Sequence, residues 1–260
     1  YILDNLSGVE VSVSSDVCPE IREYERFTTT VINAYIKPLM SNYLKKLEYE
    51  LIEKGFNCPL LLMTSGGTLT NIPSAGNNPV RLVESGPAGG AILATSIAKD
   101  LNLNKVISFD MGGTTAKITI IENKMAIKAR EFEVDRKARF KKGSGFPLRI
   151  PVIEMVEIGA GGGSIARVNK LEQIIIGPNS AGSLPGPACY CNGGTLPTIT
   201  DADLIIGKIN PENFAGGKIK LSKDLATDAI TKNISQIINL DTDTAALAIS
   251  EIVDETMSNC

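Results

Sequence analysis

The sequence contains no histidine. The chain therefore cannot itself supply a Ser-His-Asp or Cys-His pair, an H-E-x-x-H zinc site or a histidine general base. Any catalysis by these residues must use carboxylates, hydroxyl groups, lysine, arginine, backbone amides or a bound ion.

Long hydrophobic runs and strong net charge are also absent. No apolar run approaches the roughly 18 residues that a membrane-spanning helix needs, and no signal-peptide pattern opens the chain. The formal net charge of -3 gives no basic surface for nucleic acid. We expect a cytoplasmic protein with neither a nucleic-acid partner nor a membrane association.

Cysteine is scarce and irregularly placed. The five cysteines are scattered, and the stretch "PACYCNGG" holds one C-x-C pair, Cys189 and Cys191. An odd, scattered set does not favour a disulfide framework, so we expect reduced thiols. Two thiolates supply only half the ligands of a closed zinc site, and we expect no metal there.

The remaining composition is that of a globular protein. Hydrophobic residues make up 43% and charged residues 21% of 260 residues, which is enough for one large domain or two smaller ones. The chain begins at Tyr1 and stops at Cys260 within a helical pattern. We expect it to be a fragment of a longer protein.

The periodicity of the sequence predicts an α/β fold. Residues 20–54 have helical spacing, and Pro38 should divide them into two helices or one kinked helix. A buried strand at residues 60–63 and a helix from Ser85 follow. Further predicted elements are strands at residues 104–110, 116–122, 125–134, 149–157, 165–168 and 173–176, and helices at 201–209, 222–240 and 241–260.

Two successive strands, residues 104–110 and 116–122, should form one buried sheet. Their apolar side chains are expected to lie inside it. These side chains are Val106, Ile107, Phe109, Ile118 and Ile120.

The turn between these strands, in "FDMGGTTAK", is the strongest candidate for chemistry. Gly112 and Gly113 can direct backbone N–H groups toward one point, and they lack the Cβ atoms that would keep a phosphate away. Thr114 and Thr115 add hydroxyl donors, and Asp110 could hold Mg²⁺ or orient a nucleophile. The alternative is an ordinary glycine hairpin turn.

A second glycine block, "EIGAGGGSIARV", contains Gly161, Gly162 and Gly163, followed by Ser164. One interpretation is a loop whose backbone passes close to a nucleotide or substrate, with Ser164 as a donor. The other is a strained bend between two strands.

Two charged clusters have simpler interpretations. In "TDADL", Asp201 and Asp203 flank the start of a predicted helix, where Thr200 or Asp201 can cap it, and capping is favoured over metal binding. The basic segment at residues 139–151, which includes Lys141, could contact an anion or a partner subunit, but an exposed loop is the simpler interpretation.

Longer blocks of the sequence resemble known proteins. The helix "ESGPAGGAILATSIAK" followed by "VISFDMGGT" resembles the connecting helix and second phosphate loop of the actin, sugar kinase and heat-shock chaperone ATPases. Seven blocks in order are similar to the central domain of the hydantoinase and oxoprolinase family, hydantoinase A type. They are "EYERFTTTVINAYIKP", "LLLMTSGG", "ESGPAGGAI", "FDMGGTTAK", "IPVIEMVEIGAGGGSIARV", "SAGSLPGPACY" and "PTITDADLIIGKINPENFAGG".

The resemblance implies an actin-like (ribonuclease H-like) ATPase fold that uses ATP and Mg²⁺. Residues 1–102 would form the later part of the first lobe and residues 104–260 most of the second. The implied activity is ATP-dependent opening of a cyclic amide such as a hydantoin or 5-oxoproline, through phosphorylation of the amide oxygen. Asp110 would be catalytic and bind the metal. The nucleotide-binding residues would be Gly112, Gly113, Thr114, Thr115, Gly161, Gly162, Gly163 and Ser164.

The sequence also departs from the family pattern. Many members have an aspartate at the position of Lys117, and neither the first phosphate loop nor a "G-G-A-G-P" motif occurs in these residues. We therefore expect the fragment alone to be inactive. A hydantoinase B-type subunit or domain is the expected partner, and a homo-oligomer is possible. The alternatives are a subunit of an acetone or acetophenone carboxylase-like enzyme and a non-catalytic actin-like scaffold.

Overall fold

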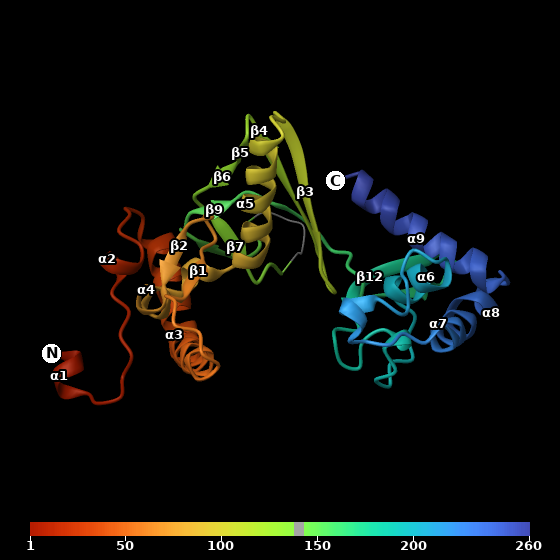
Figure 1. Cartoon of the computed structure of the whole chain (residues 1–260), viewed down its shortest axis with the longest axis horizontal. Helices are drawn as coiled ribbons and strands as arrows, with labels where there is room; N and C mark the ends of the chain where they lie inside the picture. The colour runs from red at the N-terminus through yellow and green to blue at the C-terminus, as the bar shows by residue number, and fades with distance from the viewer. Residues whose placement is uncertain (138–142) are drawn as a thin grey trace. The chain divides into compact units, whose positions relative to one another are not determined.

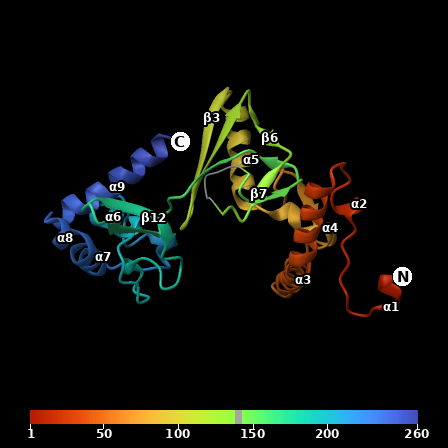
Figure 2. The same ribbon diagram turned by 180° about the vertical axis from the view of Figure 1, so that it is seen from behind.

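The computed structural model describes residues 1–137 and 143–260. They form two compact units (Figures 1 and 2). The first unit comprises Tyr1–Ser108 and Thr119–Met155, and the second comprises Phe109–Ile118 and Val156–Cys260. Among the described helices, none combines the length and the apolar character that a membrane span requires.

The first unit is built around one long helix. Its helical elements are α1 (Ile2–Asn5), α2 (Ser14–Val17), α3 (Glu23–Glu53), α4 (Ile72–Asn77), the 3₁₀ turn η1 (Pro79–Leu82) and α5 (Ser85–Asp100). Of the two predicted alternatives for residues 20–54, two separate helices are excluded, because α3 runs through Pro38 as one helix. Pro38 is exposed, so its ring meets solvent rather than packed side chains. Proline opposes a helix locally, and contacts along the rest of a 31-residue helix can outweigh that cost.

A buried asparagine joins α3 to its neighbours. Asn33 is 0% exposed, and its side-chain amide donates to the carbonyl of Asn77 at 3.0 Å and to Ser12 Oγ at 3.1 Å. Its side-chain oxygen accepts from the amide of Val80 at 3.2 Å. A buried polar group is stable only when it is hydrogen-bonded, and Asn33 meets this condition through three partners.

Short antiparallel strand pairs complete the first unit. They are β1 (Leu61–Met63) with β2 (Leu69–Asn71), β6 (Lys128–Ala129) with β9 (Val152–Ile153), and β7 (Phe132–Val134) with β8 (Phe146–Leu148). The predicted strand at residues 60–63 is confirmed by β1, but its predicted burial is wrong, since Leu61 is 50% exposed and the other three residues are half-buried. The predicted strand at 125–134 is instead divided into β5 (Met125–Ala126), β6 and β7.

A further sheet contains the strands on either side of the candidate turn. Its order is β10 (Val156–Ile158), β4 (Ala116–Glu122), β3 (Lys105–Met111), and β5 also pairs with β4. Strands β4 and β10 are antiparallel, with Ile118 opposite Val156. β3 and β4 confirm the predicted strands at residues 104–110 and 116–122, whereas the predicted strand at 149–157 is divided between β9 and β10.

The predicted burial of five side chains in this sheet is wrong. Ile107 is 69% exposed, Phe109 51% and Ile120 46%, while Val106 and Ile118 are half-buried. The physical reason is that a strand buries its side chains only where another layer covers that face of the sheet, and the described residues leave these three uncovered. Alternation along β3 places Ile107 and Phe109 on one face, where no described residue buries them.

The second unit packs helices against a two-stranded sheet. The strands are β11 (Ser164–Val168) and β12 (Ile174–Ser180). The α-helices are α6 (Ile199–Ile205), α7 (Lys223–Ile230), α8 (Gln236–Ile238) and α9 (Thr242–Ser258). Shorter helical turns are the 3₁₀ turns η2 (Ala188–Tyr190) and η3 (Phe214–Gly217) and the π-helical turn η4 (Thr231–Ser235). In Figures 1 and 2, α6, α7 and α9 gather beside β12. Their core includes the buried side chains of Ala166, Leu204, Ile230 and Ile249.

Candidate functional site

The two glycine segments singled out in the sequence lie against each other in the second unit. The amide of Gly162 donates to the carbonyl oxygen of Gly112 at 3.0 Å, and the amide of Gly163 donates to that of Gly113 at 2.7 Å. The turn between β3 and β4 is therefore held by the loop between β10 and β11. We call the turn at residues 112–115 the glycine turn and the loop at residues 159–163 the supporting loop.

Glycine is required in the supporting loop because the two backbones are so close. A Cβ atom at Gly161 would lie 2.7 Å from the carbonyl oxygen of Gly112 and from the backbone nitrogen of Thr114. At Gly163, a Cβ atom would lie 2.8 Å from the carbonyl oxygen of Gly113. These atoms belong to backbone and cannot rotate aside, so a side chain at either position would separate the loop from the turn.

These hydrogen bonds also fix the direction of two other amides. In a trans peptide the C=O of one residue and the N–H of the next point to opposite sides. The cis peptides of the described chain lie elsewhere, at Gly177-Pro178 and Leu184-Pro185. Since the carbonyls of Gly112 and Gly113 point at the supporting loop, the N–H groups of Gly113 and Thr114 point away from it. Both residues are exposed, so these two adjacent N–H groups lie in an exposed part of the turn and face away from the supporting loop.

The remaining polar groups of the glycine turn lie in the same segment. The amide of Gly112 donates to the carbonyl of Thr115 at 2.9 Å and closes the turn. Asp110 is the second-last residue of β3 and is exposed, and Thr114 is exposed whereas Thr115 is half-buried. One exposed carboxylate beside this turn is compatible with Mg²⁺, which commonly uses one or two carboxylates together with phosphate oxygens and water.

Ser164 supports the loop from inside. It is 0% exposed, its Oγ accepts from the amide of Gly161 at 3.0 Å, and its own amide donates to the carbonyl of Gly161 at 2.8 Å. Thr200 adds a second anchor, since its amide and its hydroxyl both donate to the carbonyl of Gly162, at 2.9 and 2.8 Å. The sequence did not predict that Thr200 holds the loop, because that contact joins segments far apart along the chain.

The acidic pair near α6 includes a capping group. Thr198 is the N-cap residue, and Asp201 completes the capping box by accepting from the amide of Thr198 at 2.9 Å. Capping is therefore confirmed, but the predicted cap residue, Thr200 or Asp201, is wrong by two or three positions. Asp201 also accepts from the amides of Ala188 and Cys189, at 3.2 and 2.8 Å. Burial, with the carboxylate of Asp201 nearby, raises the pKa of the Cys189 thiol.

Other sequence candidates have different surroundings. Lys117 is half-buried on β4, opposite Glu157 of β10. Lys141 lies outside the described residues, while Arg149 of the same predicted basic segment forms ion pairs with Glu20 at 3.2 Å and Glu131 at 3.1 Å. Among residues 1–137 and 143–260, no group of three His, Cys, Asp or Glu side chains is placed to hold a metal ion.

Comparison of the sequence with known proteins finds relatives that match almost the whole chain. An uncharacterized protein of Methanocaldococcus jannaschii is 47% identical over 99% of this chain and 38% of its own length. Caprolactamase subunit alpha of Pseudomonas jessenii is 34% identical over 97% of this chain and 35% of its own length.

Two solved structures superpose on almost the whole chain. Nucleotide-free acetone carboxylase, from work on ATP-dependent acetone carboxylation, superposes with a TM-score of 0.79 at 27% identity, covering 93% of this chain and 33% of that one. The crystal structure of ATP-dependent caprolactamase from Pseudomonas jessenii superposes with a TM-score of 0.68 at 33% identity, covering 95% and 34%.

The chain spans between a third and two fifths of the length of these relatives. It shares the actin-like ATPase fold of the two solved structures. The family model for hydantoinase/oxoprolinase matches residues 26–260. The chain therefore belongs to the hydantoinase/oxoprolinase family.

Proposed function

We propose that this chain is part of an ATP-dependent hydrolase that opens a cyclic amide by phosphorylating it. Caprolactamase, a relative with the same fold, is described as ATP-dependent, and its name describes a lactam substrate. An amide is a poor electrophile, so some activation of its carbonyl must precede attack by water. When bound, ATP would supply the phosphoryl group that provides this activation.

The observation that supports a nucleotide site is the pair of N–H groups at Gly113 and Thr114 that face away from the supporting loop. Two adjacent backbone donors, with a threonine hydroxyl beside them, form the kind of concavity that binds phosphate oxygens. Asp110 would hold Mg²⁺ together with those oxygens and would orient the reacting groups.

The supporting loop is assigned a different role from the glycine turn. Gly161, Gly162 and Gly163 allow the loop to pack directly on the turn and keep its N–H pair facing outward. Ser164 keeps the loop folded by accepting from Gly161. We retain these four residues as part of the nucleotide site because they fix the geometry of the donors, which is the main requirement for stabilising charge during phosphoryl transfer.

The assembly is proposed by analogy with relatives. Caprolactamase subunit alpha is by its name one component of a larger enzyme. We propose that residues 1–102 and 104–260 belong to the first and second ATPase lobes of a cytoplasmic enzyme, completed by a hydantoinase B-type subunit or domain. A homo-oligomer is compatible with this arrangement.

A carboxylase is the second candidate function. The superposition on acetone carboxylase, with a TM-score of 0.79, favours it. Phosphorylation of an amide and of a ketone would place the same demands on a phosphate-binding turn, so the residues described above fit both reactions. A requirement for bicarbonate in the intact enzyme would distinguish the carboxylase from the hydrolase.

Calorimetric titration of Mg-ATP and Mg-ADP into the intact protein tests the proposal. Asp110→Asn keeps the size of an exposed side chain and should weaken Mg-nucleotide binding by about tenfold or more. Glu122→Gln removes an exposed carboxylate at the end of β4 and should leave binding unchanged. A folded intact protein that binds neither nucleotide would rule out the ATP-dependent mechanism and favour the scaffold alternative.

A further inference from the structure

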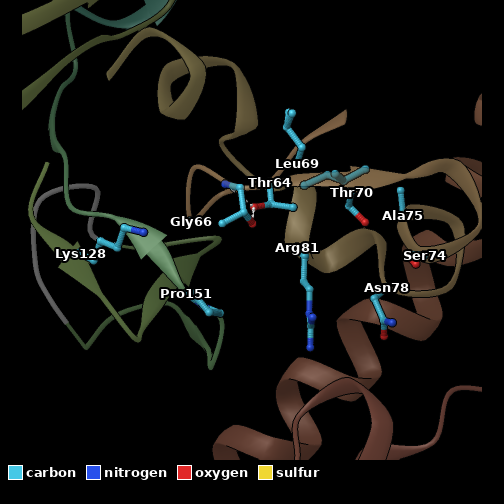
Figure 3. A pocket seen from close by; sticks show the side chains of 12 residues that line it. Thr64, Gly66, Leu69, Thr70, Ser74, Ala75, Asn78, Arg81, Lys128 and Pro151 are labelled. Atoms are coloured by element: carbon cyan, nitrogen blue, oxygen red, sulfur yellow. Dashed lines mark hydrogen bonds between the residues drawn. The ribbon is translucent and has the colours of Figure 1, made fainter. Parts of the chain in front are cut away.

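A pocket in the first unit is lined by cations, hydroxyl groups and apolar side chains, and none of the described residues that line it carries a carboxylate. Its volume is about 380 Å³, and it lies between the β1–β2 hairpin, α4, η1 and β6 (Figure 3). The lining residues are Thr64, Gly66, Thr68, Leu69, Thr70, Ser74, Ala75, Asn78, Arg81, Leu82, Lys128 and Pro151. It includes neither Asp110 nor the glycine turn.

Arg81 is held in place at its backbone while its guanidinium stays available. Its carbonyl oxygen accepts from the amide of Ser65 at 2.8 Å and from Ser65 Oγ at 2.7 Å, and its amide donates to the carbonyl of Asn78 at 3.1 Å. Ser65 is 1% exposed, so this anchor is buried. Within the part of the chain that the structure describes, no ion pair or hydrogen bond occupies the Arg81 guanidinium.

Lys128 brings the second cation from the opposite side of the pocket (Figure 3). It lies on β6, whose pairing with β9 fixes it opposite Ile153. In the described chain its ammonium group also lacks an ion pair or a hydrogen bond. The guanidinium of Arg149, which does not line the pocket, is different, because it forms ion pairs with Glu20 and Glu131.

Neutral donors complete the lining. The hydroxyl groups of Thr70 and Ser74 and the side-chain amide of Asn78 border the pocket, and none of them has a hydrogen-bond partner in the described residues. Two cations and three neutral donors, with no acidic side chain, match the oxygen atoms of an anion. The volume is within the range of pockets that hold small molecules, roughly 300–1,000 Å³.

We propose that this pocket binds the oxyanion group of a small molecule, either a carboxylate or a phosphate, with Arg81 and Lys128 as its two charged contacts. Arginine is suited to bidentate contacts with such groups, and lysine adds a point charge. The residues that line it belong to the first unit, whereas Asp110 and the glycine turn belong to the second.

Calorimetry on the intact protein without nucleotide tests this site. The probes are orthophosphate, 5-oxoproline, which is a lactam with a carboxylate, and 2-pyrrolidinone, the same ring without it. We expect orthophosphate, 5-oxoproline or both to bind, and 2-pyrrolidinone to bind at least about tenfold more weakly. Preference for orthophosphate would indicate a phosphate ligand, and preference for 5-oxoproline would indicate a carboxylate ligand.

Matched variants assign the binding to the pocket. Arg81→Gln and Lys128→Gln should each reduce affinity by at least about tenfold. Arg130→Gln removes the same charge from an exposed position outside the lining and should have no such effect. Thermal unfolding verifies that each variant is folded. Failure of both orthophosphate and 5-oxoproline to bind, or equal losses in Arg81→Gln and Arg130→Gln, would overturn the proposal.

Discussion

The amide of Gly163 donates a 2.7 Å hydrogen bond to the carbonyl oxygen of Gly113, and this contact joins two glycine segments that lie far apart in the sequence. It explains why the supporting loop contains glycine, because a Cβ atom at Gly163 would lie 2.8 Å from that carbonyl oxygen. The supporting loop needs glycine for close packing, whereas Gly113 has no neighbouring atom within 4 Å of its missing Cβ. The absence of a side chain at Gly113 leaves room on the outward face of the turn.

Two alanine substitutions separate these roles. In Gly161→Ala the new Cβ would lie 2.7 Å from backbone atoms of Gly112 and Thr114, so we expect a loss of roughly 1–3 kcal/mol in stability. Gly113→Ala should change stability by less than about 1 kcal/mol but weaken Mg-ATP binding, because its methyl group faces the proposed phosphate site. Thermal unfolding and calorimetry of the intact protein measure the two effects.

Normal stability of Gly161→Ala, or normal Mg-ATP binding by Gly113→Ala, would contradict the roles given to these two glycines. If Gly161→Ala unfolded at the same temperature as the parent, the supporting loop would not be packed on the turn as described. If Gly113→Ala bound Mg-ATP normally, the outward face of the turn would not be the phosphate site.

Alkylation should distinguish two cysteines that are only two residues apart. Cys191 is exposed, whereas Cys189 is 0% exposed and hydrogen-bonded through its amide to Asp201. Burial and the Asp201 carboxylate raise the pKa of the Cys189 thiol, so little reactive thiolate forms near neutral pH. We expect iodoacetamide to modify Cys191 at least about tenfold faster than Cys189 in the native protein.

Mass spectrometry of peptides from timed reactions measures both rates. In urea the two thiols should react at similar rates, which controls for local sequence effects. Rapid native labelling of Cys189 would mean that η2 and α6 open readily in solution and that Asp201 does not hold them together.

The sequence was sufficient to predict the strand, turn and strand at residues 104–122, because the local pattern of apolar residues and glycines determines such elements. It could not predict that the supporting loop packs on this turn. That contact depends on tertiary structure, and so does the anchoring of Gly162 by Thr200. The Arg81 pocket was missed for the same reason, since its two cations come from separate elements.

The long helix shows a second limit of sequence patterns. Helical spacing identifies α3, but it does not show which face is buried: Asn33 is 0% exposed and Tyr35 85% exposed. The buried face is selected by partners such as Asn77 and Val80, which no local pattern includes. The presence of Pro38 left both a break and a continuation open, and the structure shows that the helix continues.

The last prediction concerns pH and a half-buried carboxylate on α6. Asp203 accepts from Ser250 Oγ at 2.9 Å, and Lys208 Nζ donates to Ser250 Oγ and Asp254 Oδ2, each at 2.8 Å. Burial raises the pKa of Asp203 above its ordinary value of 3.8, although the Ser250 hydrogen bond and the charge of Lys208 oppose this shift, and Asp254 adds to it.

A raised pKa means that the folded state binds this proton more tightly than the unfolded state does. The resulting stabilisation is fully present below the unfolded pKa and is lost as the pH rises through the higher folded pKa. Asp203→Asn keeps an oxygen that accepts from Ser250 but carries no charge. Relative to the parent, it should therefore gain stability as the pH rises above about 4.

Thermal unfolding of the intact protein from acid to neutral pH measures this difference. Glu172→Gln, at an exposed loop position of the second unit, is the control and should follow the parent at every pH. If Asp203→Asn instead became less stable than the parent as the pH rose, the attraction of Lys208 for the carboxylate would outweigh its burial. The Asp203, Ser250 and Lys208 network would then be a stabilising ion pair rather than a site where a charge is buried at a cost.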